Sequence, residues 1–326
     1  MFFINSTKFM LINSMMIGVI ISICSNNWIS LWIGMEISML SFIPLMMSSK
    51  ITSSQSMIQY FIIQSLASTM FLYSIITMLI GVNMMMNEML MVISMLIKIG
   101  IAPFHNWVLI VIESIEYFVM IFLLTVMKLP PLTAMYQISS SMLMTPMMIS
   151  FIMSSISSLN QSSLRKMLGF SSIYNMTLII SSISTMKISL IFMLIYSTNM
   201  IFLIMTIESM KINFINQFVF NEFTLWVKMN LWINMLSMAG FPPLMGFISK
   251  MIIIQKLISF NEILLVSLIM LTSLLILMFY TRLVFSSMMI SNTFKKWTLN
   301  FNKPFHFIMI SNLFITFSLL AMNCML

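Results

Sequence analysis

The stretch SMLIKIGIAPFHNW, residues 94–107, lies inside a long apolar run and is the least helix-like part of that run. It places Lys98, Gly100, Pro103 and His105 within about two helical turns of one another. Each is unfavourable in a plain membrane helix, because lysine is charged, glycine is flexible and proline removes a backbone donor. Their occurrence together predicts a polar break inside a membrane-spanning segment.

The surrounding composition is that of an all-α polytopic membrane protein. Of 326 residues, 60% are hydrophobic and only 7% are charged, and the mean hydropathy is +1.08. A soluble domain of this length would need far more charge on its surface. The apolar runs are continuous over roughly 20 residues, which matches the thickness of a hydrocarbon core. A membrane β-barrel would instead alternate polar and apolar residues.

The apolar runs predict eleven spans joined by short polar links. The first run, from residue 3, has no small-residue cleavage site after it, which favours a first membrane helix over a removed signal peptide. The fourth and ninth spans are long and interrupted by glycine and proline. The spans are 3–24, 28–47, 57–82, 88–110, 118–138, 143–158, 169–186, 188–208, 229–258, 262–290 and 305–324.

The basic residues fall almost entirely on one side of this arrangement. The opposite side holds only Lys187, so the bias predicts that the first side faces the bacterial cytoplasm or the mitochondrial matrix. It places the N-terminus there and the C-terminus opposite, and it explains the net charge of +8 better than nucleic-acid binding does. The basic side collects Lys8, Lys50, Arg165, Lys166, Lys211, Lys228, Lys295, Lys296 and Lys303.

The two interrupted spans share a short pattern. GIAPF at 100–104 and GFPPL at 240–244 both begin with glycine and carry proline at the fourth position, so the predicted breaks include Gly100, Pro103, Gly240, Pro242 and Pro243. Paired Gly/Pro interruptions in two halves of a chain indicate a transporter site, although chance similarity of two kinks is the alternative. KLPPL at 128–132 predicts a third break, at Pro131.

Four ionisable residues lie near the middle of their predicted spans: Glu36, Lys98, Lys128 and Lys250. A charge at the centre of a membrane helix costs roughly 2.5–3.5 kcal/mol on insertion scales, so four in one chain indicate a function. Burial disfavours the charged form, and a buried lysine can therefore release and rebind a proton at accessible pH. The alternative is a Glu–Lys pair that only locks helices together. The Gly-Pro break beside Lys98 predicts a hydrated pocket around it.

His105 lies just beyond Pro103 and has two interpretations, a proton relay or a structural role as a helix cap or hydrogen-bonded side chain. The sequence contains no glycine-rich phosphate loop, no cysteine cluster for iron–sulfur and no histidine pair spaced for haem. Cys24 and Cys324 are interpreted as unpaired thiols, and no metal or cofactor site is expected in this chain.

Five motifs, in order, resemble those of the antiporter-like membrane subunits of respiratory complex I. The resemblance is closest to a mitochondrial member from an animal, an insect by its composition, which includes 44 methionines. The motifs extend from residue 25 to residue 251. They are SNNWISLWIGMEISMLSFIPLM, KIGIAPFHNW, KLPPLTAMYQI, SLNQSSLRKMLGFSSI and MAGFPPLMGFISKM.

This resemblance implies eleven helices in one antiporter-like domain. It implies a truncated first repeat at about 1–140, an inverted second repeat at about 141–290 and a C-terminal helix at about 305–324. Glu36, Lys98, Lys128 and Lys250 would form its mid-membrane proton-translocating series. FMN, iron–sulfur clusters and ubiquinone would belong to other subunits, the neighbours would resemble subunits 4L and 4, and lipids such as cardiolipin would surround the chain in the mitochondrial inner membrane.

The sequence departs from the family pattern at two places. Leu109 and Ile110 stand where a Pro-Glu pair is frequent, and Asn175 stands where a histidine is often found, which puts a proton relay through that helix in doubt. Two other function classes stay open, a free-standing cation/proton antiporter and a purely structural membrane anchor.

Overall fold

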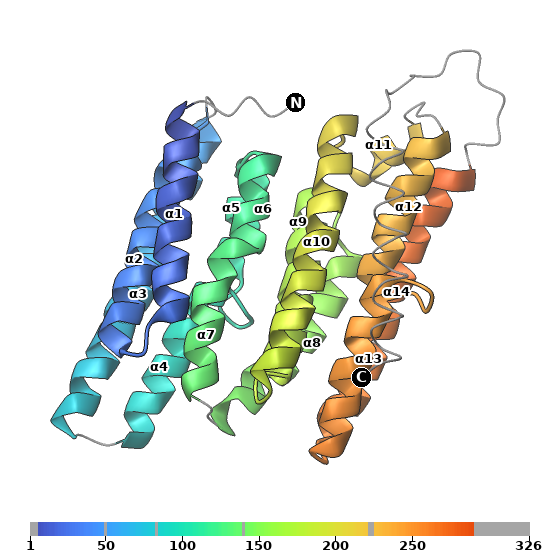
Figure 1. The fold of residues 1–326 in the computed structure, drawn as a ribbon. Helices are drawn as coiled ribbons and strands as arrows, with labels where there is room; N and C mark the ends of the chain where they lie inside the picture. Colours follow the sequence, from blue (N-terminus) through green and yellow to red (C-terminus); the bar gives the residue numbers. More distant parts are fainter. Residues whose placement is uncertain (1–5, 49–50, 82–83, 139–140, 221–224, 290–326) are drawn as a thin grey trace. The chain divides into compact units, whose positions relative to one another are not determined.

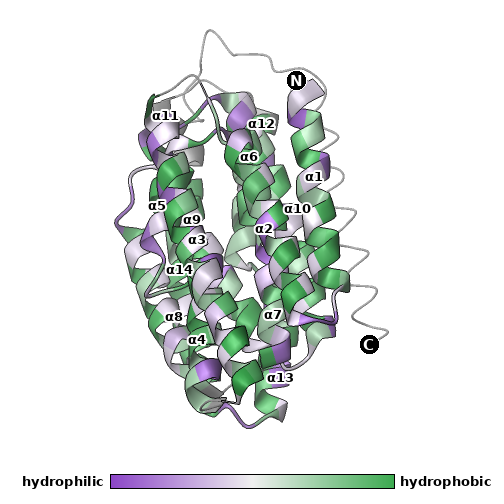
Figure 2. Ribbon diagram, turned by 90° about the vertical axis from the view of Figure 1, so that its left-hand side faces the viewer, coloured by the Kyte–Doolittle hydropathy of each residue, from purple (hydrophilic) through white to green (hydrophobic). Residues whose placement is uncertain are grey.

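The computed structural model describes residues 6–48, 51–81, 84–138, 141–220 and 225–289. Throughout these ranges the chain is helical, with one isolated β-bridge between Ser163 and Phe214. Within each of the two compact units, the long helices run roughly side by side (Figure 1). Hydrophobic residues are spread along their length (Figure 2), as expected for helices surrounded by lipid.

The helix bounds follow the predicted spans closely but divide three of them. The fourth span is split into α4 and α5, the fifth into α6 and α7, and the ninth into α12 and α13. The helices are α1 (Ser6–Cys24), α2 (Trp28–Leu45), α3 (Ile51–Ile80), α4 (Met84–Ile99), α5 (Asn106–Ser114), α6 (Tyr117–Leu124), α7 (Leu129–Ile138), α8 (Met144–Leu159), α9 (Leu164–Ser181), α10 (Met186–Met210), α11 (Ile215–Phe220), α12 (Leu225–Ala239), α13 (Met245–Ser259) and α14 (Ile263–Met289), with 3-10 turns η1 (Val126–Lys128) and η2 (Ser141–Leu143).

Six helical segments within the described ranges are long and apolar enough to cross a membrane. They are Ser6–Cys24, Trp28–Leu45, Ile51–Ile80, Tyr117–Ile138, Met186–Met210 and Ile263–Phe285. This agrees with the predicted class of polytopic, all-helical membrane protein. The eleventh predicted span, 305–324, and the basic segment 292–303 lie outside the described residues, so the count of eleven stays a prediction.

Serine-rich segments are more helical than the sequence predicts. The third helix begins at Ile51, although residues 48–56 read as a polar link. Ser54 donates its hydroxyl to the Ile51 carbonyl at 2.7 Å, and Ser56 donates to Ser53 at 2.9 Å. Such bonds to the preceding turn satisfy the hydroxyl within the helix itself, so serine is tolerated where water is absent.

The crossing of α1 and α2 depends on two glycines. A Cβ at Gly18 would lie 2.6 Å from the Ser38 nitrogen, and one at Gly34 would lie 2.7 Å from the Ser22 nitrogen. Both distances are far below a van der Waals contact, so only glycine allows the two backbones to meet here. Each helix thus uses a glycine and a serine four residues later, as small-residue membrane contacts do.

The chain divides into two compact units, Met1–Ser150 and Phe151–Leu326. In the first unit α3 packs against α2, α4 and α5, and α7 packs against α1, α2 and α4. In the second unit α12 packs against α10, α13 and α14, and α9, which packs against α10 and α13, is buried along almost its whole length. Each unit contains one of the two Gly-Pro interruptions.

Candidate functional site

The first interruption begins with a left-handed glycine at the end of α4. Gly100 has φ +78°, and the N–H groups of Gly100 and Ile101 both donate to the Leu96 carbonyl, at 2.9 and 3.2 Å. A turn closed by Phe104 N–H on the Ile101 carbonyl at 2.8 Å follows, before α5 starts. Glycine reaches this backbone region without steric cost, which is why the helix stops here.

The second interruption repeats this geometry at the end of α12. Gly240 has φ +84°, and the N–H groups of Gly240 and Phe241 both donate to the Leu236 carbonyl, at 3.0 and 3.1 Å. Leu244 N–H then closes the following turn on the Phe241 carbonyl at 2.9 Å. The likeness of GIAPF and GFPPL therefore extends to three backbone hydrogen bonds that the two turns share, which argues against chance similarity.

Side chains satisfy the carbonyls that the first interruption leaves free. The Trp107 indole of α5 donates to the Ile97 carbonyl at 3.0 Å, and the Gln64 amide of α3 reaches the Lys98 carbonyl at 3.5 Å. Carbonyls at a helix end lack an intrahelical partner, and in a membrane an unmet one is costly. Trp107 and Gln64 therefore stabilise the broken conformation.

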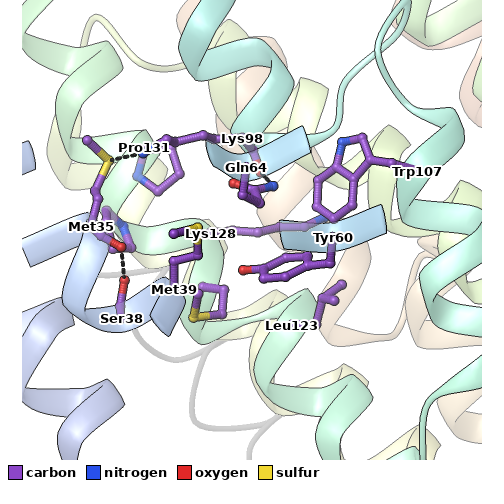
Figure 3. A pocket seen from close by; sticks show the side chains of 12 residues that line it. Met35, Ser38, Met39, Tyr60, Gln64, Lys98, Trp107, Leu123, Lys128 and Pro131 are labelled. Carbon is purple, nitrogen blue, oxygen red and sulfur yellow. Dashed lines mark hydrogen bonds between the residues drawn. The ribbon is translucent and has the colours of Figure 1, made fainter. Parts of the chain in front are cut away.

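Lys98 points from the end of α4 toward α2 (Figure 3). Its Nζ donates to the Met35 sulfur at 3.7 Å. The side chain lines a cavity of about 30 Å³, together with the buried Lys128 and the polar groups of Tyr60 and Gln64. A cavity of this size holds about two water molecules. This cavity lies beside the break, where the sequence predicts a hydrated pocket, and polar groups form part of its lining.

Glu36 does not pair with Lys98 in this structure. An ion pair of the first unit joins Lys8 to Glu116 instead, at 3.2 Å. Glu36 follows Met35 on α2, about 100° further around the helix, and its Oε1 is buried with no hydrogen-bond partner in the described part of the chain. The predicted approach of Glu36 and Lys98 in some state of the protein stays a prediction.

Lys128 is 3% exposed and ends the 3-10 turn η1 between α6 and α7. The prediction of a helix break at Pro131 is wrong. The interruption precedes it, at Thr125, whose hydroxyl donates to the Ile121 carbonyl at 2.6 Å. Pro130 and Pro131 lie in the first turn of α7, where a missing backbone N–H removes no helical bond.

His105 occupies the residue before α5, in the N-cap position. Among the described residues its side chain makes no capping hydrogen bond to that helix, while its carbonyl accepts from Val108 N–H at 3.1 Å. Capping by the imidazole is therefore not what fixes this helix start, and the relay interpretation of His105 stays a prediction.

Lys250 belongs to the second unit and turns back from α13 to the interruption. Its Nζ donates to the Ala239 carbonyl, the last residue of α12, at 2.7 Å. The same nitrogen lies 5.4 Å from the centre of the Tyr174 ring. A cation near the carbonyl end of a helix is favourable, so Lys250 acts as a side-chain cap of α12. Lys98 and Lys250 thus each lie beside one interruption.

Within the described ranges, no group of three or more His, Cys, Asp or Glu side chains lies close enough to hold a metal ion. The polar atoms around each interruption are lysine, amide, hydroxyl and indole groups. This set can hold water and exchange protons.

Comparison with known proteins assigns the chain to a family. The model of the transmembrane family described as NADH:quinone oxidoreductase/Mrp antiporter matches residues 25–276, well over half of the chain. The chain belongs to this family. The predicted resemblance to antiporter-like membrane subunits is therefore confirmed.

Curated relatives of this antiporter-like chain include NADH-ubiquinone oxidoreductase chain 2 of Locusta migratoria, 36% identical over 222 residues and 65% of both chains. The same subunit of Anopheles gambiae is 36% identical over 165 residues, 48% of both chains. That of Didelphis virginiana is 38% identical over 176 residues, half of this chain and 51% of its own. The chain spans 65% or less of the length of these relatives. The insect affinity predicted from composition is compatible with them.

Solved structures share the fold of this antiporter-like chain. A chain of respiratory complex I from Thermus thermophilus matches with TM-score 0.82 at 17% identity, over 97% of this chain and 78% of that one. The archaeal membrane-bound sulfane sulfur reductase matches with TM-score 0.83, also at 17% identity, over 97% and 74%. The Mrp complex of Dietzia matches with TM-score 0.74 at 15% identity, over 84% and 59%.

Sequence reasoning missed the groups that surround the lysines. Met35, Tyr60 and Trp107 line the first cavity, and their residue types predict only apolar packing. Lys228 is a separate case, because the sequence places it in a basic link and the structure buries it within α12, 5% exposed. Gln64 carried a usable signal, because an amide in the middle of an apolar span must find a partner. The others carried none that residue type alone could reveal.

Proposed function

We propose that this chain is the chain 2 type membrane subunit of a proton-pumping NADH:ubiquinone oxidoreductase. The observation that carries the proposal is the pair of similar helix interruptions, one beside the partly buried Lys98 and the other beside the buried Lys250. Family membership and the named relatives support the choice of complex. Lys98, Lys128 and Lys250 take up and release protons in it, and Glu36 modulates Lys98.

The chemistry follows from the neutral partners of two of these lysines. Lys98 contacts a thioether and Lys250 contacts a backbone carbonyl. Neither partner stabilises the charged form of the lysine as strongly as a carboxylate would. A rearrangement that brings Glu36 to Lys98 favours the charged lysine, and its withdrawal favours release. Energy for this change comes from redox chemistry elsewhere, with FMN, iron–sulfur clusters and ubiquinone bound by other subunits.

The proposal extends to architecture and surroundings. The chain forms eleven membrane helices in two inverted repeats, about 1–140 and 141–290, with the final helix at about 305–324. It lies in the mitochondrial inner membrane, with its N-terminus in the matrix and its C-terminus in the intermembrane space. Its neighbours are subunits that resemble 4L and 4, and cardiolipin contacts its surface. His105 is a relay candidate within this path.

A free-standing cation/proton antiporter is the second candidate, favoured by the shared fold of the Mrp complex. Purification of the native protein separates the two. We expect it to co-migrate with flavin- and iron–sulfur-containing subunits, and its vesicles to acidify only when NADH is oxidised. A chain that purifies without those subunits and exchanges cations for protons across vesicles unaided would overturn the proposal.

A further inference from the structure

The Met35 sulfur on α2 lies in a polar setting. Its side chain is 4% exposed, and its Sδ accepts a hydrogen bond from the Lys98 ammonium at 3.7 Å (Figure 3). Methionine usually fills gaps among apolar neighbours, and its thioether is only a weak hydrogen-bond acceptor. This sulfur therefore has a proton donor and a polar cavity beside it, which are the two things that its oxidation requires.

The cavity beside this sulfur has room for a small oxidant. Its volume of about 30 Å³ accepts about two waters, and hydrogen peroxide, with two bonded oxygen atoms, needs no more space than they do. The Tyr60 hydroxyl, the Gln64 amide and Lys128 belong to its lining and can form hydrogen bonds to the oxygens of a peroxide. Lys98 is only partly buried, so a small polar molecule can reach the cavity along this side chain.

We propose that Met35 is a specific oxidation site, which hydrogen peroxide converts to methionine sulfoxide with Lys98 as the proton donor. The sulfur attacks one peroxide oxygen, so that an S–O bond forms as the O–O bond breaks. The sulfur is oxidised and the peroxide is reduced. Lys98 gives a proton to the departing oxygen, which leaves as water, and Lys98 then takes back the proton of the new S–OH group. The balance is one thioether and one hydrogen peroxide to one sulfoxide and one water.

Met39 provides a comparison within the same cavity. It lies four residues after Met35 and therefore on the same face of α2. It is 5% exposed and lines the same cavity, while the Lys98 ammonium donates to Met35. The two methionines match in burial and in access to the cavity, so a difference in their oxidation reports the contact with Lys98.

Oxidation of Met35 changes the partner of Lys98. A sulfoxide is polar, and its oxygen accepts a hydrogen bond from an ammonium far more strongly than a thioether sulfur does. A strong bond to the charged form of a lysine favours that form. The consequence rests on the proposed function: a Lys98 that is held in its charged form on α2 does not release its proton, so proton translocation falls when Met35 is oxidised.

The oxidation site is tested by exposing the purified complex to hydrogen peroxide and following the sulfoxides of Met35 and Met39 by peptide mass spectrometry. A positioned proton donor commonly speeds a reaction by about 10²-fold or more, so we expect Met35 to be oxidised at least about tenfold faster than Met39. Lys98→Leu removes the donor without adding another methionine, and it should bring the Met35 rate down to that of Met39. Equal rates at the two methionines of the natural chain, or an unchanged ratio in Lys98→Leu, would overturn the proposal.

The effect on Lys98 is tested in vesicles that contain the complex. Protons translocated per electron pair are measured before and after peroxide treatment, and each variant is compared with its own untreated sample. We expect a loss in the natural chain and in Met39→Leu that grows with the amount of Met35 sulfoxide, and no loss in Met35→Leu. An equal loss in Met35→Leu would refute the effect of the sulfoxide on Lys98. Normal translocation in Lys98→Met would instead refute the proposed function of that lysine, and mass spectrometry would still decide the oxidation site.

Discussion

At the scale of single residues, the main finding is that two lysines, the partly buried Lys98 and the buried Lys250, lie at helix interruptions beside neutral acceptors. Lys98 meets the Met35 sulfur and Lys250 meets the Ala239 carbonyl. A carboxylate partner would fix the positive charge, whereas a weak neutral acceptor lets the ammonium lose its proton without leaving a buried anion behind. The sequence identified both lysines by their depth, but the acceptors depend on which helix faces them, and spacing does not encode that.

Replacement of Lys98 tests its titration. Lys98→Met removes a buried charge and keeps an apolar chain of similar length, so we expect assembly to persist. The step that uses this lysine should slow by about 10²-fold or more, the usual loss for a proton-transfer group. Lys98→Arg should also fail, because arginine keeps its proton at accessible pH. Proton translocation in vesicles measures both variants.

The control for this series is Lys256→Met, which changes an exposed lysine of α13 and should translocate normally. If Lys98→Arg pumps at the natural rate, titration of this residue is excluded and a fixed positive charge is its role.

Met35 offers a separate prediction about the Glu36–Lys98 pair. Met35→Leu removes the sulfur acceptor and nearly keeps the volume, a change that cores tolerate well. The Lys98 Nζ then loses the acceptor that it has on α2, and we expect it to move within 4 Å of a Glu36 oxygen. A density map of the variant measures the distance. An ammonium that stays at its present position would show that the thioether does not hold it.

At the scale of helices, the interruptions follow from glycine, and proline has a supporting role. Gly100 and Gly240 were predicted as break points, and the structure ends α4 and α12 one residue before them. The Pro131 prediction failed because the chain had already left α6 at Thr125, so the proline entered a new first turn. Proline marks a discontinuity in a sequence without showing on which side of it the helix ends.

Alanine substitutions at Gly81 and Gly100, which both have a positive φ, separate the cost of backbone strain from the cost of a steric clash. Gly81 has φ +83° and open space around it, so Gly81→Ala should cost about 1–2 kcal/mol of left-handed strain alone. At Gly100 an added Cβ would also collide with the Val108 side chain, and we expect a larger loss. Thermal stability of the purified complex, or the midpoint of its dissociation in detergent, measures the difference. Equal losses would show that the α4–α5 turn yields easily to a methyl group.

At the scale of the whole molecule, the lengths of the apolar runs predicted most of the helices, because few other structures can cross a membrane. The serine-rich start of α3 and the short helix α11 were not predicted, since polar composition reads as a link even when hydroxyls bond within a helix. The family resemblance implies a repeat boundary at about residue 140, whereas the compact units divide after Ser150. That division depends on which helices pack together, and periodicity along one helix does not contain that information.

The two ends of α9 provide the sharpest test of orientation. This helix has 18 residues, about 27 Å of rise, so in the proposed arrangement its ends are predicted to lie near opposite faces of the hydrocarbon core. Arg165 and Lys166 lie at its start and are predicted to face the matrix. Asn160 before it and Ser184 after it are both exposed and suit single-cysteine labelling, in a chain whose Cys24 and Cys324 are replaced by serine.

We expect a membrane-impermeant thiol reagent to label Ser184→Cys in sealed mitoplasts and Asn160→Cys only after the inner membrane is opened. The physical reason is that translocating Arg165 and Lys166 would carry two strongly hydrated cations through the hydrocarbon, while the opposite link carries only Lys187. Because the two sites bracket one helix, they control for each other. Labelling of Asn160→Cys in sealed mitoplasts, with Ser184→Cys protected, would invert the orientation proposed for every helix of the chain.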